Sequence, residues 1–287
     1  MKFGFFYLIM IIEKIINNNV VIALDDNRQE TVVMGKGIGF QAKAGQHLDA
    51  NKIEKRFVLD SKSDTGRFGE LVQSIPLEHF EVCMKIIDYA MQVMHIRLSN
   101  SIYISLTDHI NFALERYKTG LVFENPLLQE VRSFYQSEYL IGEYAVALVE
   151  RDLGVKLPID EAASIALHFV NAEYKTPMSD TMNITTLIRQ VLNIVDTELN
   201  VKLDELGIHY SRFVTHLKYL AYRTFAGQGM SRQEAELVEM VRTLYGREYA
   251  ISEKIAAFIL EKYDYEIPEE EKAYLTLHIR RIQPNIQ

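Results

Sequence analysis

The chain carries the stretch PIDEAASIALHF at residues 158–169 and a matching stretch, PEEEKAYLTLHI, at residues 268–279. Each stretch begins with a proline, continues into acidic residues and reaches a histidine ten positions after the proline. These two histidines, His168 and His278, are 110 positions apart. Acidic side chains such as Glu161 are typical of the first turn of a helix, where they cap free amides and meet the helix dipole. Both stretches are therefore predicted to be helices that carry a histidine.

A second histidine recurs in the same way, as His109 within the sequence DHI and as His216 within the sequence THL. His216 follows His109 by 107 positions, close to the spacing of the other two histidines. A repeat of this length predicts two copies of one domain rather than a short-period solenoid. The four histidines occupy equivalent positions in the two copies. This match indicates that the histidines were retained in both copies for a shared role.

Both copies have the pattern of amphipathic helices. Apolar residues recur at a spacing of three and four, as at Val82, Ile86 and Tyr89. We expect residues 74–178 to form the first copy and residues 179–287 to form the second, each an all-α bundle of about five helices.

The N-terminal region has a different pattern. Residues 11–59 alternate short β-branched or apolar runs with turn sequences rich in Asn, Asp and Gly, which predicts four or five short strands. We assign residues 10–62 to a small antiparallel, barrel-like domain whose core is marginal by itself, so that dimerisation would complete it. The polar segment 63–73 is the predicted linker. Residues 1–9 form a predicted upstream extension, with Met10 as an alternative start. The predicted fold class is thus a multidomain β plus all-α protein.

Composition limits the possible functions. The 287 residues are 48% hydrophobic, enough for several cores, and the net charge is −8. Residues 10–60 contain seven basic and seven acidic residues, so any nucleic-acid site there must be local rather than a bulk basic surface. The single cysteine, Cys83, excludes an internal disulfide framework and suits a reducing compartment.

The four histidines allow three interpretations. A histidine among apolar residues is often a half-buried core residue, although four matched positions favour a chemical role over packing. A metal site would need three or four convergent ligands, and neither copy has a cysteine partner or an HExxH motif, so we predict no metal. Acceptance of a phosphoryl group remains, since neutral imidazole has a free lone pair and the charged product alters a helix interface.

Four motifs together carry a resemblance to a known family. They are KIINNNVV at 14–21, VMGKGIGFQ at 33–41, KIEK at 52–55 and SLTDHINFA at 105–113. In this order, and with the doubled histidine pattern, the chain resembles the BglG/SacY family of transcriptional antiterminators, and most of all its LicT branch. The resemblance covers essentially everything after residue 9.

The resemblance implies a function and a set of partners. The N-terminal domain of such proteins dimerises and binds an RNA antiterminator hairpin in a leader transcript, which prevents an overlapping terminator from forming. The helical copies resemble phosphotransferase-system (PTS) regulation domains, with His109, His168, His216 and His278 as phosphorylation sites. A sugar-specific enzyme II inhibits through the first copy and HPr activates through the second. The branch implies a β-glucoside operon and a cytoplasmic protein, with no cofactor, no catalytic residue and no membrane partner.

The RNA-contacting positions carried over from the motifs are Lys14, Asn19, Gly35, Lys36, Phe40 and Gln41. An aromatic ring can stack on an unstacked base, an asparagine can bond base edges, and lysines can meet phosphates. The alternative for the glycines is a turn, and the alternative for Phe40 is a place in the core of the sheet domain. At position 36 the family often has arginine, so lysine there predicts a contact to phosphate alone.

Two other functions stay open from the sequence. A DNA-binding transcriptional activator with the same regulation domains would need a helix-turn-helix ahead of residue 70, where the pattern is strand-like. An enzyme such as a metal hydrolase would need a motif of the P-loop, nucleophile-elbow or metal-binding-helix type, and the sequence contains none of these.

Overall fold

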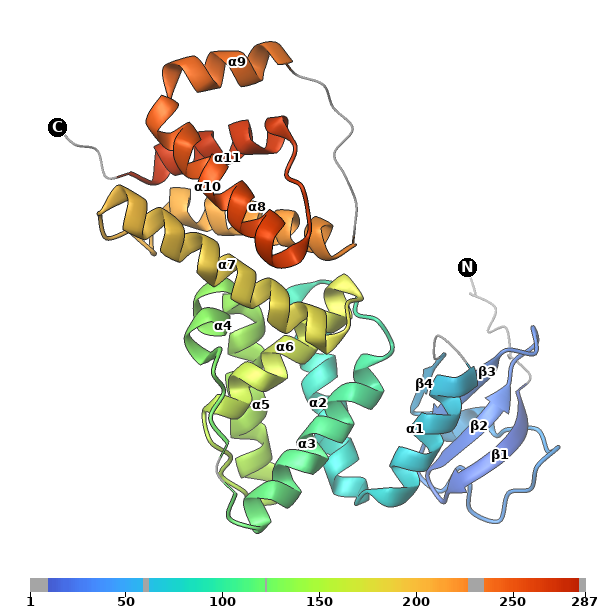
Figure 1. The fold of residues 1–287 in the computed structure, drawn as a ribbon. Helices are drawn as coiled ribbons and strands as arrows, with labels where there is room; N and C mark the ends of the chain where they lie inside the picture. Colours follow the sequence, from blue (N-terminus) through green and yellow to red (C-terminus); the bar gives the residue numbers. More distant parts are fainter. Residues whose placement is uncertain (1–9, 59–61, 122, 227–234, 284–287) are drawn as a thin grey trace, which may run out of the picture. The chain divides into compact units, whose positions relative to one another are not determined.

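The structure is a computed structural model that describes residues 10–58, 62–121, 123–226 and 235–283. The predicted N-terminal extension, residues 1–9, lies outside the described residues. The chain divides into two compact units, each described here by itself (Figure 1). The first unit comprises residues 1–126 and 137–176, and the second comprises residues 127–136 and 177–287.

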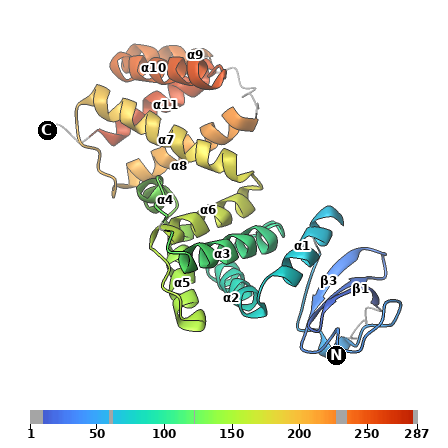
Figure 2. The ribbon, with the colours of Figure 1, turned by 60° about the horizontal axis from the view of Figure 1, so that its bottom comes forward.

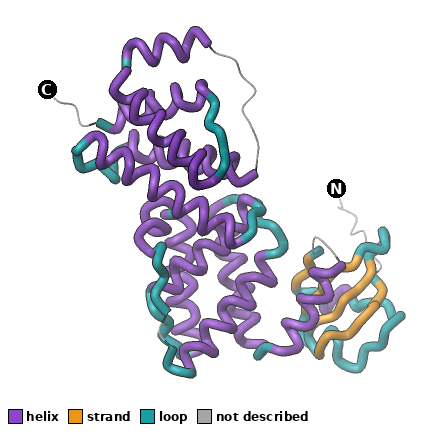
Figure 3. Tube along the Cα trace, in the orientation of Figure 1, coloured by secondary structure: helices purple, strands orange, loops and turns teal. Residues whose placement is uncertain are grey.

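The N-terminal part of the first unit is an antiparallel sheet, as predicted. Its strands are β1 (Ile11–Asn17), β2 (Val20–Leu24), β3 (Glu30–Met34) and β4 (Lys55–Phe57), paired in the order β1-β2-β3-β4 (Figure 3). The described strands β1 and β4 stand at the two edges of this sheet, which is open, so the barrel-like closure expected from the sequence is not seen. Before residue 58 the described residues contain one further element, the three-residue 3-10 helix η1 (Ala50–Lys52), and no helix-turn-helix.

The two faces of the sheet pack into different cores. Alternate residues of a strand point to opposite faces, and Val20 and Ile22 accordingly join a cluster with Phe68, while Val21 and Ala23 join a smaller cluster. The smaller cluster lies under the segment between β3 and β4. Helices of the same unit therefore cover one face of the sheet.

The helix that covers this face lies where a linker was expected. Residues 63–73 fall within α1 (Lys62–Ser74), which contacts β1 and β3 (Figure 2). Its Phe68 ring is fully buried and meets Phe57 of β4 edge-on. Residues 63–73 are mostly polar, but Phe68 and Val72 form one apolar stripe on the helix. These two side chains are buried against the sheet.

The remaining helices of the first unit belong to the first copy. They are α2 (Leu77–Met94), α3 (Ile102–Lys118), α5 (Gln136–Leu153) and α6 (Asp160–Tyr174). Helix α3 contacts α1, α2 and α6, so the helix that carries His109 lies at the centre of the unit. Gly142 permits a close approach of α5 and α6, because a Cβ at this position would lie 2.0 Å from the carbonyl oxygen of Ala162.

The second unit contains the second copy and one helix from the first. Its helices are α4 (Leu128–Phe134), α7 (Met178–Leu199), α8 (Ile208–Ala226), α9 (Ala235–Leu244), α10 (Gly246–Tyr263) and α11 (Glu269–Ile282). Helix α4 packs on α7, and the Thr185 hydroxyl donates to the Tyr135 hydroxyl at 3.4 Å. The compact units therefore do not divide at residue 178, where the sequence copies do. No helix among the described residues is long and apolar enough to cross a membrane.

Candidate functional site

The turn between β1 and β2 is tied to the glycine-rich segment after β3. The Asn19 side-chain oxygen accepts a hydrogen bond from the Gly37 amide at 2.9 Å, and the Asn19 carbonyl accepts from the Gly35 amide at 3.0 Å. A further bond joins the Gly39 amide to the Asn18 carbonyl at 3.0 Å. Asn19 thus has a structural role that the sequence did not reveal, and its side-chain NH2 group is what remains to donate to a ligand.

Two glycines in this segment are required by the protein's own backbone. A Cβ on Gly35 would lie 1.6 Å from the carbonyl oxygen of Lys52, and a Cβ on Gly39 would lie 2.2 Å from that of Asn17. Any larger residue at either place would force the loop away from its neighbour. Gly35 is buried, so it shapes the surface rather than lying on it.

The other candidate contact residues lie on the surface. Phe40 has 59% of its side chain exposed, which excludes the alternative that it belongs to the core. Lys14, Lys36 and Gln41 are exposed as well. Gln41 has a positive φ of 56°, so the backbone turns sharply immediately after the exposed ring. An exposed aromatic ring is a surface on which single-stranded bases can stack.

Three of the six candidates line one cavity. Asn19, Gly35 and Lys36 share a cavity of about 640 Å³ with Lys55 of β4 and with the first turns of α2, including Glu81. Phe40, Gln41 and Lys14 are not among the residues that line it. The predicted contact residues therefore form a surface wider than one pocket, with helix α2 of the first copy at one side of it.

The first histidine pair joins α3 to α6. The rings of His109 and His168 have centroids 4.7 Å apart. His109 is half-buried, and its Nε2 lies 3.0 Å from Oε2 of Glu161. Arg116, two turns further along α3, pairs with the other oxygen of Glu161. Burial opposes ionisation of Glu161 most strongly, but the hydrogen bond from His109 and the charge of Arg116 outweigh it, so the pKa of Glu161 lies below its ordinary value.

A second pair lies at the matched positions, between α8 and α11. The rings of His216 and His278 also have centroids 4.7 Å apart. His216 Nε2 lies 2.7 Å from Glu271 Oε1, and Arg223 pairs with the second oxygen of the same carboxylate. Each copy thus holds two imidazoles, one buried glutamate and one arginine at matched positions. The His216–Glu271 contact lacks the hydrogen-bond geometry that joins His109 to Glu161 in the first copy.

The chemistry of the pairs follows from their burial. Burial and the neighbouring His109 lower the pKa of His168 to about 3. Burial, His216 and Arg281 lower the pKa of His278 to about 4, against a smaller opposing effect of Glu271. Both rings are therefore neutral at physiological pH, which is the nucleophilic form. An ionised Glu161 can only accept hydrogen bonds, so His109 donates its Nε2–H to this carboxylate.

Sequence reasoning missed the roles of the glutamates and arginines. We predicted that Glu161 caps its helix, but α6 has no side-chain hydrogen bond at its N-cap and Glu161 instead pairs with His109 and Arg116. The repeat contained the signal, because Arg223 follows Arg116 by the same 107 positions that separate their histidines, and Glu271 follows Glu161 by 110. Among the described residues no group of three or more His, Cys, Asp or Glu side chains is placed to hold a metal ion.

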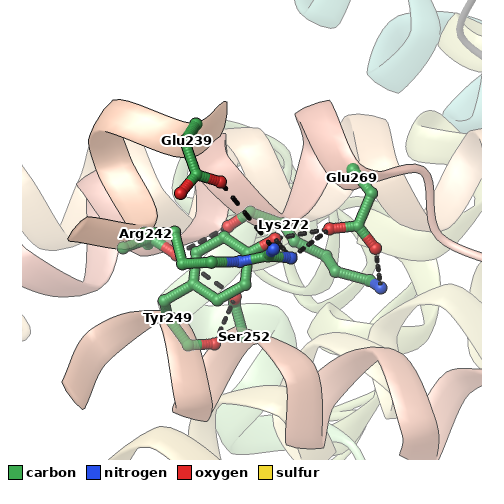
Figure 4. Close-up of polar contacts among 7 residues, drawn as sticks. Glu239, Arg242, Tyr249, Ser252, Glu269 and Lys272 are labelled. Carbon is green, nitrogen blue, oxygen red and sulfur yellow. Dashed lines mark hydrogen bonds and ion pairs between the residues drawn. The ribbon is translucent and has the colours of Figure 1, made fainter. Parts of the chain in front are cut away.

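A polar network orients α11, which carries Glu271 and His278. Arg242 of α9 donates to the Tyr249 hydroxyl at 3.1 Å and to Glu269 at 3.0 Å, and the Tyr249 hydroxyl donates to Glu269 at 2.5 Å (Figure 4). Lys272 pairs with the second oxygen of Glu269 at 2.6 Å. Because Glu269 lies in the first turn of α11, this network fixes the start of the helix that carries the second histidine pair.

Comparison with known families assigns the domains. The family model described as the CAT RNA binding domain matches residues 10–65, and the PRD domain model matches residues 84–172 and 189–282. The transcription antiterminator LicT of Bacillus subtilis (strain 168) is 43% identical over 273 residues, which cover 95% of this chain and 99% of that protein. The beta-glucoside operon antiterminator of Dickeya chrysanthemi is 41% identical, over 97% of this chain and 98% of that protein.

One solved structure covers the N-terminal half. The crystal structure of GlcT CAT-PRDI is 32% identical in sequence and aligns with a TM-score of 0.52. The alignment covers 57% of this chain and 98% of that chain. It supports the succession of a small sheet domain and a helical domain in the first unit.

Proposed function

Because this chain belongs to the BglG/SacY family of transcription antiterminators, with a CAT RNA-binding domain and two PRD domains, we propose that its sheet domain acts as a dimer on an RNA antiterminator hairpin. Binding of the hairpin would keep an overlapping terminator from forming, so that transcription continues. The similarity to the beta-glucoside operon antiterminator supports a β-glucoside operon as the target. No observation favours a DNA-binding activator, since the described residues ahead of α1 form strands.

We propose the exposed surface around Phe40 as the RNA contact. Phe40 supplies a stacking platform, Lys14 and Lys36 meet phosphates, and the Asn19 NH2 group donates to a base edge. Gln41 would add one more polar contact, while Gly35 keeps the loop in the required shape. Two observations support this assignment: Phe40 is a large aromatic ring that is exposed, and the net charge of the domain is neutral. A neutral domain has little bulk attraction for RNA, so the binding energy must come from local contacts.

The regulatory part of the proposal concerns the four histidines. A sugar-specific PTS enzyme II would phosphorylate His109 or His168 and inhibit, and HPr would phosphorylate His216 or His278 and activate. The observation that carries this proposal is the repeated pair of facing imidazoles, each with its buried glutamate and its arginine. A phosphoryl group brings nearly two negative charges at neutral pH, and the carboxylate beside each pair must respond to them.

The switch is tested with single histidine variants in a reporter assay. A leader hairpin with its terminator is placed ahead of a reporter gene in cells that contain the phosphotransferase system. We expect His109→Ala or His168→Ala to give expression without inducer, and His216→Ala or His278→Ala to abolish induction. Normal induction in all four variants would contradict the proposal, and an unchanged melting temperature of each purified variant excludes loss of folding as the cause.

A further inference from the structure

The two histidine pairs have the same types of residue at their centre: two histidines, a glutamate and an arginine. They differ in the residues that flank the histidines on the same helices. At the position four residues before the first histidine of each pair, the first copy has Ser105 and the second has Arg212. At the position three residues after the second histidine, the first copy has Asn171 and the second has Arg281. Residues three or four apart on a helix lie on the same face, so both arginines are neighbours of the second pair.

These two arginines are free to bind an anion. Arg212 and Arg281 are exposed, and within the described part of the chain neither forms an ion pair. The charge of Arg281 reaches the pair, since it contributes to the lowered pKa of His278. An unpaired guanidinium next to a reactive imidazole is suited to a phosphoryl group, because its planar donors match phosphate oxygens.

The first copy offers no such cation at the matched places. Ser105 and Asn171 carry no charge, and the residue next to His109 is the exposed carboxylate Asp108, where the second copy has Thr215. Its nearby arginine, Arg116, is already paired with Glu161. A phosphoryl group added there would have to compete with that glutamate for Arg116.

We propose that Arg212 and Arg281 form a phosphoryl-binding rim around His216 and His278, and that the first pair lacks one. The inference rests on the proposed phosphorylation of these histidines and adds to it the residues that hold the product. A phosphoryl group in the second copy is neutralised where it forms, whereas in the first copy it disturbs the contact between Glu161 and Arg116. The two copies therefore respond to the same modification in opposite ways.

The transfer itself is the same in both copies. The lone pair of an imidazole nitrogen forms a bond to phosphorus, and the phosphorus–nitrogen bond of the donor breaks. The donor amine leaves with its electron pair and takes up the proton that the imidazole loses. Phosphoramidate is such a donor and releases ammonia. It phosphorylates histidines without a protein partner, so the effect of the rim on phosphate lifetime can be measured without contacts from a donor protein.

The test uses the full chain treated with potassium phosphoramidate. After removal of the donor, the loss of phosphate from each of the four histidines is followed by mass spectrometry of peptides kept at neutral to basic pH. Arg212→Ser with Arg281→Asn gives the second copy the residues of the first, and Ser105→Arg with Asn171→Arg makes the reciprocal change. Arg132→Asn with Arg247→Ser removes two exposed arginines, on α4 and α10, and is the control for net charge.

We expect the second pair to keep its phosphate longer than the first, by about 1.4- to fivefold for each arginine, the range that exposed charge pairs give. The double arginine variant should lose this difference, and the reciprocal variant should lengthen the lifetime on His109 or His168. Equal lifetimes in the wild type and in both exchanged variants would overturn the rim and leave the phosphorylation proposal intact. Absence of label on all four histidines would overturn both.

Discussion

The ring of Phe57 in β4 stacks on the ring of Tyr103 in α3, with centroids 4.6 Å apart and planes inclined by 13°. Lys55, two residues earlier in β4, pairs with Asp88 of α2 and lies 5.4 Å from the centre of the Tyr103 ring. His109 follows Tyr103 by six residues on the same helix, less than two helical turns. One helix therefore carries both the contact to the sheet and the first candidate phosphoacceptor.

Removal of this stack should loosen the sheet. Tyr103 is buried at the junction, and truncation of a large buried aromatic side chain costs about 3–5 kcal/mol. We expect Tyr103→Ala to lower the free energy of unfolding of the first unit by about 3 kcal/mol. Hydrogen exchange of peptides from β3 and β4 should become faster. Tyr117→Ala removes an exposed tyrosine from the same helix and should leave exchange in the sheet unchanged. Equal effects of the two variants would mean that the stack contributes nothing specific.

Truncation of Phe40 should weaken RNA binding without affecting stability. Stacking of a base on an aromatic ring is worth about 1–3 kcal/mol, which corresponds to roughly a five- to 150-fold loss of affinity in Phe40→Ala. The melting temperature should stay within the error of the wild type, because the ring is exposed. Phe112→Ala is a matched control, since Phe112 is 60% exposed but lies on α3. Titration of a labelled leader hairpin at fixed salt measures both, and unchanged affinity in Phe40→Ala would remove the stacking role.

The loop that presents Phe40 should depend on Gly35. In Gly35→Ala the added Cβ collides with the carbonyl of Lys52, so the segment after β3 must move. We expect a loss of about 1–3 kcal/mol in stability, typical of overpacking, together with weaker hairpin binding. Gly66→Ala in α1 is the contrasting substitution, because a Cβ there meets open space and alanine favours the helix by about 0.5–1 kcal/mol. Chemical denaturation of the two variants should therefore shift in opposite directions.

The repeat and the periodicities were enough to predict most of the architecture. Short β-branched or apolar runs between turn sequences predicted four or five strands, and the described residues form four. The three-four spacing predicted helices in both copies. The polar segment 63–73 misled the prediction, because only Phe68 and Val72 in α1 mark the face that the sheet buries. A two-residue apolar stripe is too weak a signal without knowledge of what it packs against.

The centre of each histidine pair was also only partly predictable. The matched spacing identified His109 and His216 as a repeated feature, but Glu161 was interpreted from its local position at a helix start. Its true partners lie 45 and 52 residues away, in α3. Long-range pairing of this kind depends on how helices pack, which local rules for helix ends do not contain. The same offsets applied to every charged residue would have revealed Arg116 and Glu161 together with their counterparts.

Stability of the first unit should fall as the solution is acidified through the range of histidine. The ordinary pKa of histidine is about 6.5, whereas burial and His109 lower the pKa of His168 to about 3. Between these values the unfolded chain binds a proton that the folded chain excludes, so stability is complete above pH 6.5 and declines below it. The titratable and charged groups at this pair are His109, whose ring faces His168, and Glu161 and Arg116, which form an ion pair beside His109.

This pH dependence is measured by thermal unfolding from pH 7 to pH 5. Replacement of His168 by Asn removes the titrating group, so the decline should become shallower even though the variant starts from a lower stability. His95→Asn is the control, since His95 is exposed and its left-handed φ of 53° is one that asparagine adopts readily. A decline as steep in His168→Asn as in the wild type would assign the effect to another group.

The network in Figure 4 should matter for the second histidine pair alone. Tyr249 is buried, and its hydroxyl joins Arg242 of α9 to Glu269 of α11. Tyr249→Phe leaves both charged partners without this bridge, and a hydrogen bond to a charged group is worth about 1.5–3 kcal/mol. We therefore expect faster hydrogen exchange at the start of α11 and a matching loss in the stability of the second unit. Tyr219→Phe, at an exposed tyrosine of α8, should change neither.

Because α11 also carries Glu271 and His278, Tyr249→Phe should slow chemical phosphorylation of His278 and spare His168 in the first unit. An equal change at both histidines would show that the network does not act through the position of α11.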